Sequence, residues 1–110
     1  MTQRFKPEVS IPVITSNRIN TPELANAVIE AGVADMVSMA RPFLADPHFA
    51  DKAALGESRA INTCIACNQA CLDQIFEHKT VSCLVNPRAC HETKLIYETT
   101  SQPKRIAVVG

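Results

Sequence analysis

The sequence predicts an α/β fold with parallel strands, followed by a cysteine-rich segment. Two observations predict the sheet. Short apolar runs alternate with helical patterns, and a capping residue followed by proline stands before each expected helix. A third observation is that four of the five cysteines lie between residues 64 and 83. The chain thus combines an α/β pattern with a candidate metal site.

The first expected unit begins with an apolar, β-branched run at 11–15, which is typical of a buried strand. After a polar loop, Thr21 offers a capping hydroxyl and Pro22 suits the first helical position. Gly32 predicts the end of this helix. One apolar stripe repeats along it at helical spacing: Leu24, Ala27, Val28 and Ala31.

A second unit of the same kind follows. The run 33–39 predicts the next strand, and Asp46 followed by Pro47 repeats the capping signature. We expect a helix from there to about Leu55, ended by Gly56. Strand, loop, helix repeated twice is the pattern of a parallel sheet.

The composition excludes several function classes. The 110 residues carry a formal net charge of zero, and scattered Lys and Arg give no electrostatic footprint for nucleic acid. No apolar run is long enough to cross a bilayer, and the polar N-terminus lacks the apolar core of a secretory signal. We therefore expect a globular, cytoplasmic protein without nucleic-acid or membrane partners.

The cysteines have the spacing C-x2-C-x3-C-x11-C, formed by Cys64, Cys67, Cys71 and Cys83. Thiolates are soft ligands that select iron–sulfur clusters, zinc or cuprous ions. Three close thiols and one distant thiol favour a four-iron cluster, whereas zinc sites more often show two C-x2-C pairs. Zinc stays open as the alternative. Cys90 falls outside the spacing and is interpreted as an inert thiol.

Two further points concern these thiols. A disulfide framework is disfavoured because the cysteine count is odd and no secretory segment is visible. If residues 68–76 are helical, Cys67 and Cys71 are four apart and share one face. The three histidines have no partner at catalytic spacing, and the chain shows no hydrolase signature, so we assign no catalytic residue.

Each expected strand is followed by a loop that carries an arginine, Arg18 in the first and Arg41 in the second. Because α/β folds bind ligands at the carboxyl ends of their strands, these guanidinium groups could hold the phosphate of a cofactor. The alternative is that they form ordinary surface ion pairs with Asp35, Asp46 or Glu23. Taken alone, the arginines favour this alternative.

The C-terminal part is of a different character. Residues 91–103 are polar and end in proline, which is typical of a linker. Residues 104–110 then give a basic lead-in, four apolar residues and a glycine, as at the first strand of a dinucleotide-binding unit. A single glycine leaves that motif incomplete, and any parallel strand that reaches a turn would also fit.

Four stretches resemble the iron–sulfur flavoenzyme branch of the old yellow enzyme family, in particular its bacterial NADPH-dependent 2,4-dienoyl-CoA reductases. They cover much of the chain: SNRIN at 16–20, DMVSMARPFLAD at 35–46, CIACNQACLDQIF at 64–76 and VSCLVNPRACHETK at 81–94. The resemblance implies an FMN-binding (β/α)8 TIM barrel, a 4Fe-4S cluster beside it, and C-terminal domains for FAD and NADPH.

Mapped onto this chain, the resemblance implies four parts. Residues 1–60 would be the last two βα units of the barrel, 61–90 the cluster segment, 91–103 the linker and 104–110 the first strand of a truncated, Rossmann-like FAD domain. Two sets of residues carry the implied sites. They are Cys64, Cys67, Cys71 and Cys83 for the cluster, and Arg18, Ala40 and Arg41 for FMN.

The implied reaction belongs to fatty-acid β-oxidation. Electrons pass from NADPH through FAD, the cluster and FMN to the conjugated double bonds of a 2,4-dienoyl-CoA substrate. Two alternatives stay open: a zinc-binding interaction module without catalysis, and a flavoenzyme of the same family that acts on an amine or another enoate. Because two βα units cannot close a barrel, we expect the isolated chain to be inactive and to fold poorly.

Overall fold

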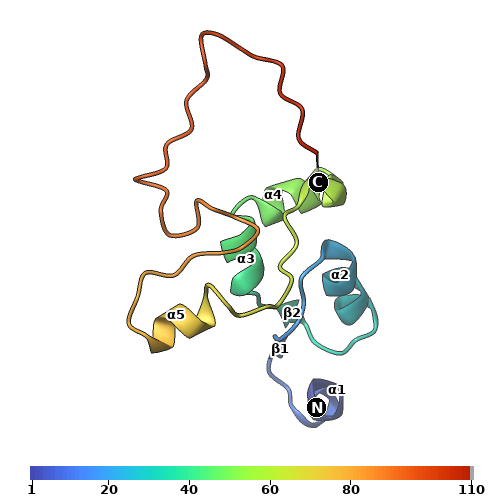
Figure 1. Ribbon diagram of the computed structural model, residues 1–110. Coiled ribbons are helices and arrows are strands. Elements are labelled where there is room, and N and C mark those ends of the chain that lie inside the picture. Colours follow the sequence, from blue (N-terminus) through green and yellow to red (C-terminus); the bar gives the residue numbers. More distant parts are fainter. Residues whose placement is uncertain (110) are drawn as a thin grey trace.

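The computed structural model describes residues 1–109 and contains a pair of parallel strands flanked by short helices (Figure 1). The elements follow one another along the chain as α1 (Thr2–Phe5), the 3₁₀ turn η1 (Lys6–Glu8), β1 (Ile14–Thr15), α2 (Pro22–Glu30), β2 (Met36–Val37), α3 (Arg41–Ala45), α4 (Phe49–Ala54), the 3₁₀ turn η2 (Ser58–Ala60) and α5 (Leu72–Phe76).

The expected parallel pairing of two strands is confirmed, although both strands are shorter than the sequence pattern indicates. Ile14 lies opposite Met36, and Thr15 lies opposite Val37. The pairing extends slightly beyond these residues, because the Ser38 amide donates to the carbonyl of Thr15 at 2.8 Å. A right-handed connection through a helix is the usual way to join two parallel strands, and α2 provides that helix here.

Helix α2 forms where the sequence predicts it. The Thr21 hydroxyl accepts a hydrogen bond from the Leu24 amide at 3.2 Å, and Pro22 occupies the first turn. The helix ends at Glu30, and Gly32 adopts a φ of +64°, a conformation that glycine reaches without steric cost. Local capping chemistry is therefore sufficient to place this helix.

The second expected helix is wrong in its details. The chain forms α3 before Asp46 and begins α4 only at Phe49, so the predicted helix opening at Asp46 and Pro47 does not occur. The rings of Phe43 and Phe49 lie 5.7 Å apart between centroids and pack α3 against α4. Proline still opens a helix, but it is Pro42 in α3.

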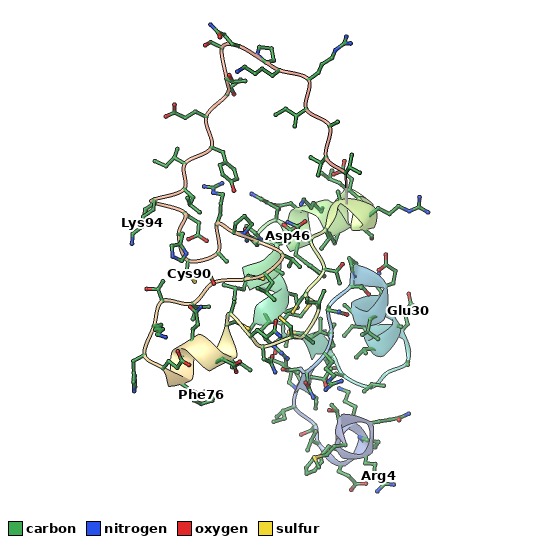
Figure 2. All side chains as sticks on the ribbon, in the orientation of Figure 1. Arg4, Glu30, Asp46, Phe76, Cys90 and Lys94 are labelled. Carbon is green, nitrogen blue, oxygen red and sulfur yellow. The ribbon has the colours of Figure 1, made fainter. Side chains whose placement is uncertain are left out.

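Asp46 turns inward and joins three parts of the chain. Its side chain is only 2% exposed. One carboxylate oxygen accepts from the His48 amide at 3.0 Å, and the other accepts from Lys52 Nζ at 2.6 Å and from the Asn62 amide at 2.9 Å. Figure 2 shows Asp46 at the junction of α3 and α4. The carboxylate therefore stabilises the turn between α3 and α4 and also holds the start of the cysteine segment against that turn.

Residues 96–109 form an exposed, irregular excursion (Figure 1). The strand expected at 104–110 is not formed within 104–109, and Gly110 lies outside the described residues. A strand exists only where a neighbouring strand pairs with it, and 104–109 lie beside neither β1 nor β2 in the sheet. The division of the chain into barrel, cluster, linker and FAD parts stays a prediction.

The described part of the chain has a small core and an expanded shape. Its radius of gyration is 17.6 Å, against roughly 13 Å for a compact domain of this length. Most of the buried apolar residues are alanines, and the strand residues Ile14 and Met36 remain 57% and 47% exposed. Among residues 1–109, no helix has the length and apolar character needed to cross a membrane.

Acid should weaken the Asp46 junction. Burial raises the pKa of Asp46, but the hydrogen bonds from Lys52 and from the Asn62 and His48 amides outweigh it, so the pKa lies below its ordinary value of 3.8. A depressed carboxyl pKa stabilises the fold above the unfolded-state pKa, and the stabilisation is lost as pH falls through the lower folded value. We expect Asp46→Asn to lower the free energy of unfolding at pH 7 by about 2–3 kcal/mol.

Denaturant unfolding followed by circular dichroism, at pH 7 and at several pH values below 4, measures this effect. The matched control is Asp51→Asn, because that carboxylate is 78% exposed and should change the stability little. Equal stability of wild type and Asp46→Asn at pH 7 would contradict the structural role of this residue.

Candidate metal and flavin site

The four cysteines of the C-x2-C-x3-C-x11-C motif line one recess. It holds about 330 Å³ of empty space, part of it open to solvent, and Arg41 and Leu44 form its wall on the α3 side. Cys67 is exposed, and the other three motif cysteines are half-buried. Cys64, Cys67, Cys71 and Cys83 therefore line the same recess and Cys90 does not, and their role as cluster ligands stays a prediction. Figure 2 shows Cys90 on the segment that follows α5.

The first three cysteines lie on a loop with unusual backbone angles. Ala66 and Asn68 both adopt left-handed conformations, with φ of +56° and +64°. Helix α5 begins only at Leu72, and Cys71 is its N-cap. Residues 68–71 therefore lie outside the helix, so the condition under which Cys67 and Cys71 would share a helix face is not met. Both cysteines line the recess from a loop with left-handed turns.

The fourth cysteine returns to the others through backbone pairing. The Ser82 amide donates to the carbonyl of Ala70 at 2.8 Å and closes the excursion that contains α5. Cys83 then forms an isolated antiparallel bridge with Asn86. The Asn86 side chain donates to the carbonyl of Leu44 at 2.9 Å, which anchors this end of the segment to α3.

The donor set of the recess is soft and its surroundings are largely apolar. Besides the thiols, several apolar side chains line it: Leu44, Ile65, Ala70, Leu84 and Val85. No histidine lines it. In the described part of the chain, no three His, Cys, Asp or Glu side chains gather in a way that would hold a metal ion. The four thiols line the same cavity.

A second recess lies at the carboxyl ends of β1 and β2. It holds about 420 Å³ of empty space and is lined by the three residues expected to contact a flavin: Arg18, Ala40 and Arg41. The structure thus brings together residues from two successive loops. Asn17 and Arg18 have φ of +89° and +56°. Two consecutive left-handed residues that are not glycine cost free energy, and such conformations cluster at ligand-binding loops.

The two arginines are not engaged in the ion pairs that the alternative interpretation expects from Asp35 and Asp46. Asp35 accepts from Lys6 and from the Val13 amide, and Lys6 lowers the pKa of Asp35 most. Asp46 pairs with Lys52. Arg41 instead donates to a neutral acceptor, the side-chain oxygen of Asn68.

The thiol recess and the arginine recess are adjacent. A connecting hollow of about 520 Å³ is lined by both arginines together with Cys64 and Ala66. The side chain of Asn20 crosses this boundary and donates to the carbonyl of Cys64 at 3.0 Å. Figure 1 shows the same arrangement on a larger scale, since the chain after α4 returns toward the strand ends before it reaches α5.

Three asparagines that the sequence did not single out hold this arrangement together, namely Asn20, Asn68 and Asn86. Their only sequence signal is a general one, because asparagine tolerates left-handed backbone and bonds readily to nearby backbone groups. That signal does not reveal partners that lie 27 to 44 positions away.

Comparison with known proteins gives consistent relatives. Residues 1–59 match the NADH:flavin oxidoreductase / NADH oxidase family. The chain is 52% identical over 106 residues to a metal reductase of Desulforamulus reducens, covering 96% of this chain and 16% of that protein. It is 40% identical over 109 residues to a bilirubin reductase of Mediterraneibacter gnavus, covering 99% of this chain and 17% of that protein.

The solved structure of a 2-naphthoyl-CoA reductase in complex with 2-naphthoyl-CoA is similar in fold as well as in sequence. It superposes with a TM-score of 0.80 at 33% identity, covering 84% of this chain and 14% of the reductase. The chain therefore spans about a sixth of the length of the relatives that it matches.

The left-handed turn at Ala66 should tolerate glycine and reject a β-branched residue. Ala66→Val would force an isopropyl group into a φ of +56°, which we expect to lower the free energy of unfolding by about 2 kcal/mol. Ala66→Gly should leave it within about 1 kcal/mol of wild type. Thermal unfolding of both variants measures the difference, and equal stabilities would argue against the observed turn.

Proposed function

The chain belongs to the NADH:flavin oxidoreductase / NADH oxidase family, and from this premise we propose that it carries the junction between a 4Fe-4S cluster and FMN in an iron–sulfur flavin reductase. One observation supports this most directly. The thiol recess and the arginine recess share Arg41, and the connecting hollow between them is lined by Arg18 and Arg41 together with Cys64 and Ala66. A junction of this kind suits electron transfer between two cofactors.

On this proposal, Cys64, Cys67, Cys71 and Cys83 hold the cluster. Four soft thiols, no histidine and a largely apolar wall fit iron–sulfur ligation. A single tetrahedral zinc ion, at about 2.3 Å from each sulfur, would draw the sulfurs to about 3.8 Å from one another. The feature that favours a four-iron cluster over one zinc ion is the spacing of three close thiols and one distant thiol.

On the flavin side, Arg18 and Arg41 would bind the phosphate of FMN, with Ala40 beside it. Guanidinium groups offer donors in a planar fork that matches phosphate oxygens, and neither Asp35 nor Asp46 competes for them. When bound, FMN supplies a centre that exchanges electrons singly or in pairs. The residues of this chain orient its phosphate and place that end of the flavin beside the cluster loop.

The substrate and the electron donor extend this proposal beyond the chain. We propose that the whole protein takes electrons from NADPH through FAD and reduces a conjugated CoA thioester of the 2,4-dienoyl class. The similarity to an enzyme named as a 2-naphthoyl-CoA reductase supports a CoA thioester. Because this chain carries no assigned proton donor, we expect it to bind cofactors without turning over substrate.

Anaerobic reconstitution tests the cluster. Incubation of the reduced chain with ferrous iron and sulfide should give a brown protein with about four irons per chain, bleached by dithionite. Cys83→Ser should lower iron retention at least tenfold, as an estimate from ligand-shell variants. Cys90→Ser is the matched control and should behave as wild type, because Cys90 does not line the recess. A colourless protein with one tightly held zinc would support the interaction-module alternative instead.

Flavin titration tests the arginines. Removing one charge-assisted interaction in Arg41→Ala should cost about 1.5–3 kcal/mol, so the Kd for FMN should rise roughly 10- to 150-fold. Arg59→Ala is the control, since Arg59 is exposed in η2 and lines none of the three recesses. Quenching of flavin fluorescence gives the Kd. Unchanged FMN affinity in Arg41→Ala would rule out the phosphate-binding role.

A further inference from the structure

Arg41 belongs to both candidate cofactor sites. It lines the thiol recess, the connecting hollow and the arginine recess. Its Nη1 donates to the side-chain oxygen of Asn68, which lies between Cys67 and Cys71 in the cysteine loop. One side chain therefore joins the loop that would hold the cluster to the loop that would hold the flavin phosphate.

The position of Asn68 depends on the shape of the cysteine loop. Its φ of +64° is a left-handed conformation, and its carbonyl accepts the Asp73 amide at 3.1 Å at the start of α5. The loop is fastened a second time by the hydrogen bond from Asn20 to the Cys64 carbonyl. A ligand that holds the four cysteines in place would therefore also hold the Asn68 side-chain oxygen, which accepts the hydrogen bond from Arg41.

The chemistry of this contact suits a positioning role. A guanidinium has five N–H donors, so one bond to Asn68 leaves the others available for an anion. Because asparagine is neutral, the contact orients the fork without cancelling its charge. A free arginine side chain loses roughly 2 kcal/mol of rotamer entropy when it is fixed, so a pre-oriented Arg41 would bind a phosphate more tightly than a mobile one.

We propose that Asn68 is a positioning residue that couples the two cofactors, so that cluster assembly raises the affinity of the chain for FMN. This inference rests on the proposed function. The coupling acts through Arg41 and therefore through the phosphate group rather than the isoalloxazine ring. By linkage it is reciprocal, and bound FMN stabilises the cluster by the same factor.

The test compares two ligands in two states of the 110-residue chain. The Kd values for FMN and for riboflavin, which lacks the phosphate, are measured with the cluster reconstituted and with the cluster removed by chelation. In wild type we expect cluster loading to tighten FMN binding about 5- to 20-fold. Riboflavin binding should change less than about twofold, since it gives Arg41 no phosphate to bind.

Three variants separate positioning from a general structural effect. Asn68→Gly keeps the left-handed backbone and removes the acceptor, so the FMN ratio between the two states should fall to about one while iron content stays at the wild-type level. Asn68→Asp keeps an acceptor but neutralises Arg41, so it should weaken FMN binding and spare riboflavin. His78→Gly is the control: His78 also has a positive φ, of +56°, but is exposed and outside the recesses.

The outcomes are distinguishable. The coupling is overturned if Asn68→Gly retains iron and keeps the wild-type ratio, or if riboflavin gains as much affinity as FMN. If Asn68→Gly does not retain iron, Asn68→Asp decides: equal losses for FMN and riboflavin would overturn the coupling, and a loss confined to FMN would support it. Failure of the proposed function looks different, because the wild-type chain would then bind no cluster or no FMN at all.

Discussion

Polar anchors, rather than an extensive core, hold the cysteine segment against the α/β unit. Asp46 binds the Asn62 amide, Asn20 binds the Cys64 carbonyl and Asn86 binds the Leu44 carbonyl. The buried apolar residues are mostly alanines, which provide little hydrophobic stabilisation. The geometry of the thiol recess therefore depends on a few hydrogen bonds, and each is made to a backbone group whose position is set elsewhere in the chain.

Backbone strain is concentrated at the two candidate sites. Of the six left-handed residues other than glycine, Asn17 and Arg18 flank the arginine recess, and Ala66 and Asn68 line or adjoin the thiol recess. At two of these four positions the residue is asparagine, which lowers the free-energy cost of the left-handed conformation. Arginine and alanine at the other two positions do not lower it. Such conformations persist only where the surroundings fix them, and here the anchors from Asn20 and Arg41 do so.

Local signals were enough to predict part of this structure. The Thr21 cap with Pro22 placed α2, and alternating patterns gave the parallel pair of strands. The four motif cysteines line one recess, and Arg18 and Arg41 line another; their roles in binding a cluster and a flavin stay predictions. Parallel strands bring their carboxyl ends to one edge, so the proximity of Arg18 and Arg41 follows from topology.

What the sequence did not reveal depends on distant contacts. Asp46 looked like a helix cap, but burial beside Lys52 and Asn62 makes it a junction, and the helix begins later. The sequence left open whether residues 68–76 are helical, and α5 begins only at Leu72, after the left-handed Asn68. The apolar run at 106–109 has strand character, yet no neighbouring strand pairs with it in the described chain.

In the proposed junction, Arg41 would lie between two anionic groups, the thiolate-ligated cluster and the flavin phosphate. A thiolate-ligated cluster, whose recess reaches the connecting hollow through Cys64, and a phosphate on the other side would repel each other. A guanidinium between them lowers that repulsion, and its effect is larger in a partly enclosed recess than in water. The neutral acceptor on Asn68 preserves the full charge, which a carboxylate at that position would cancel.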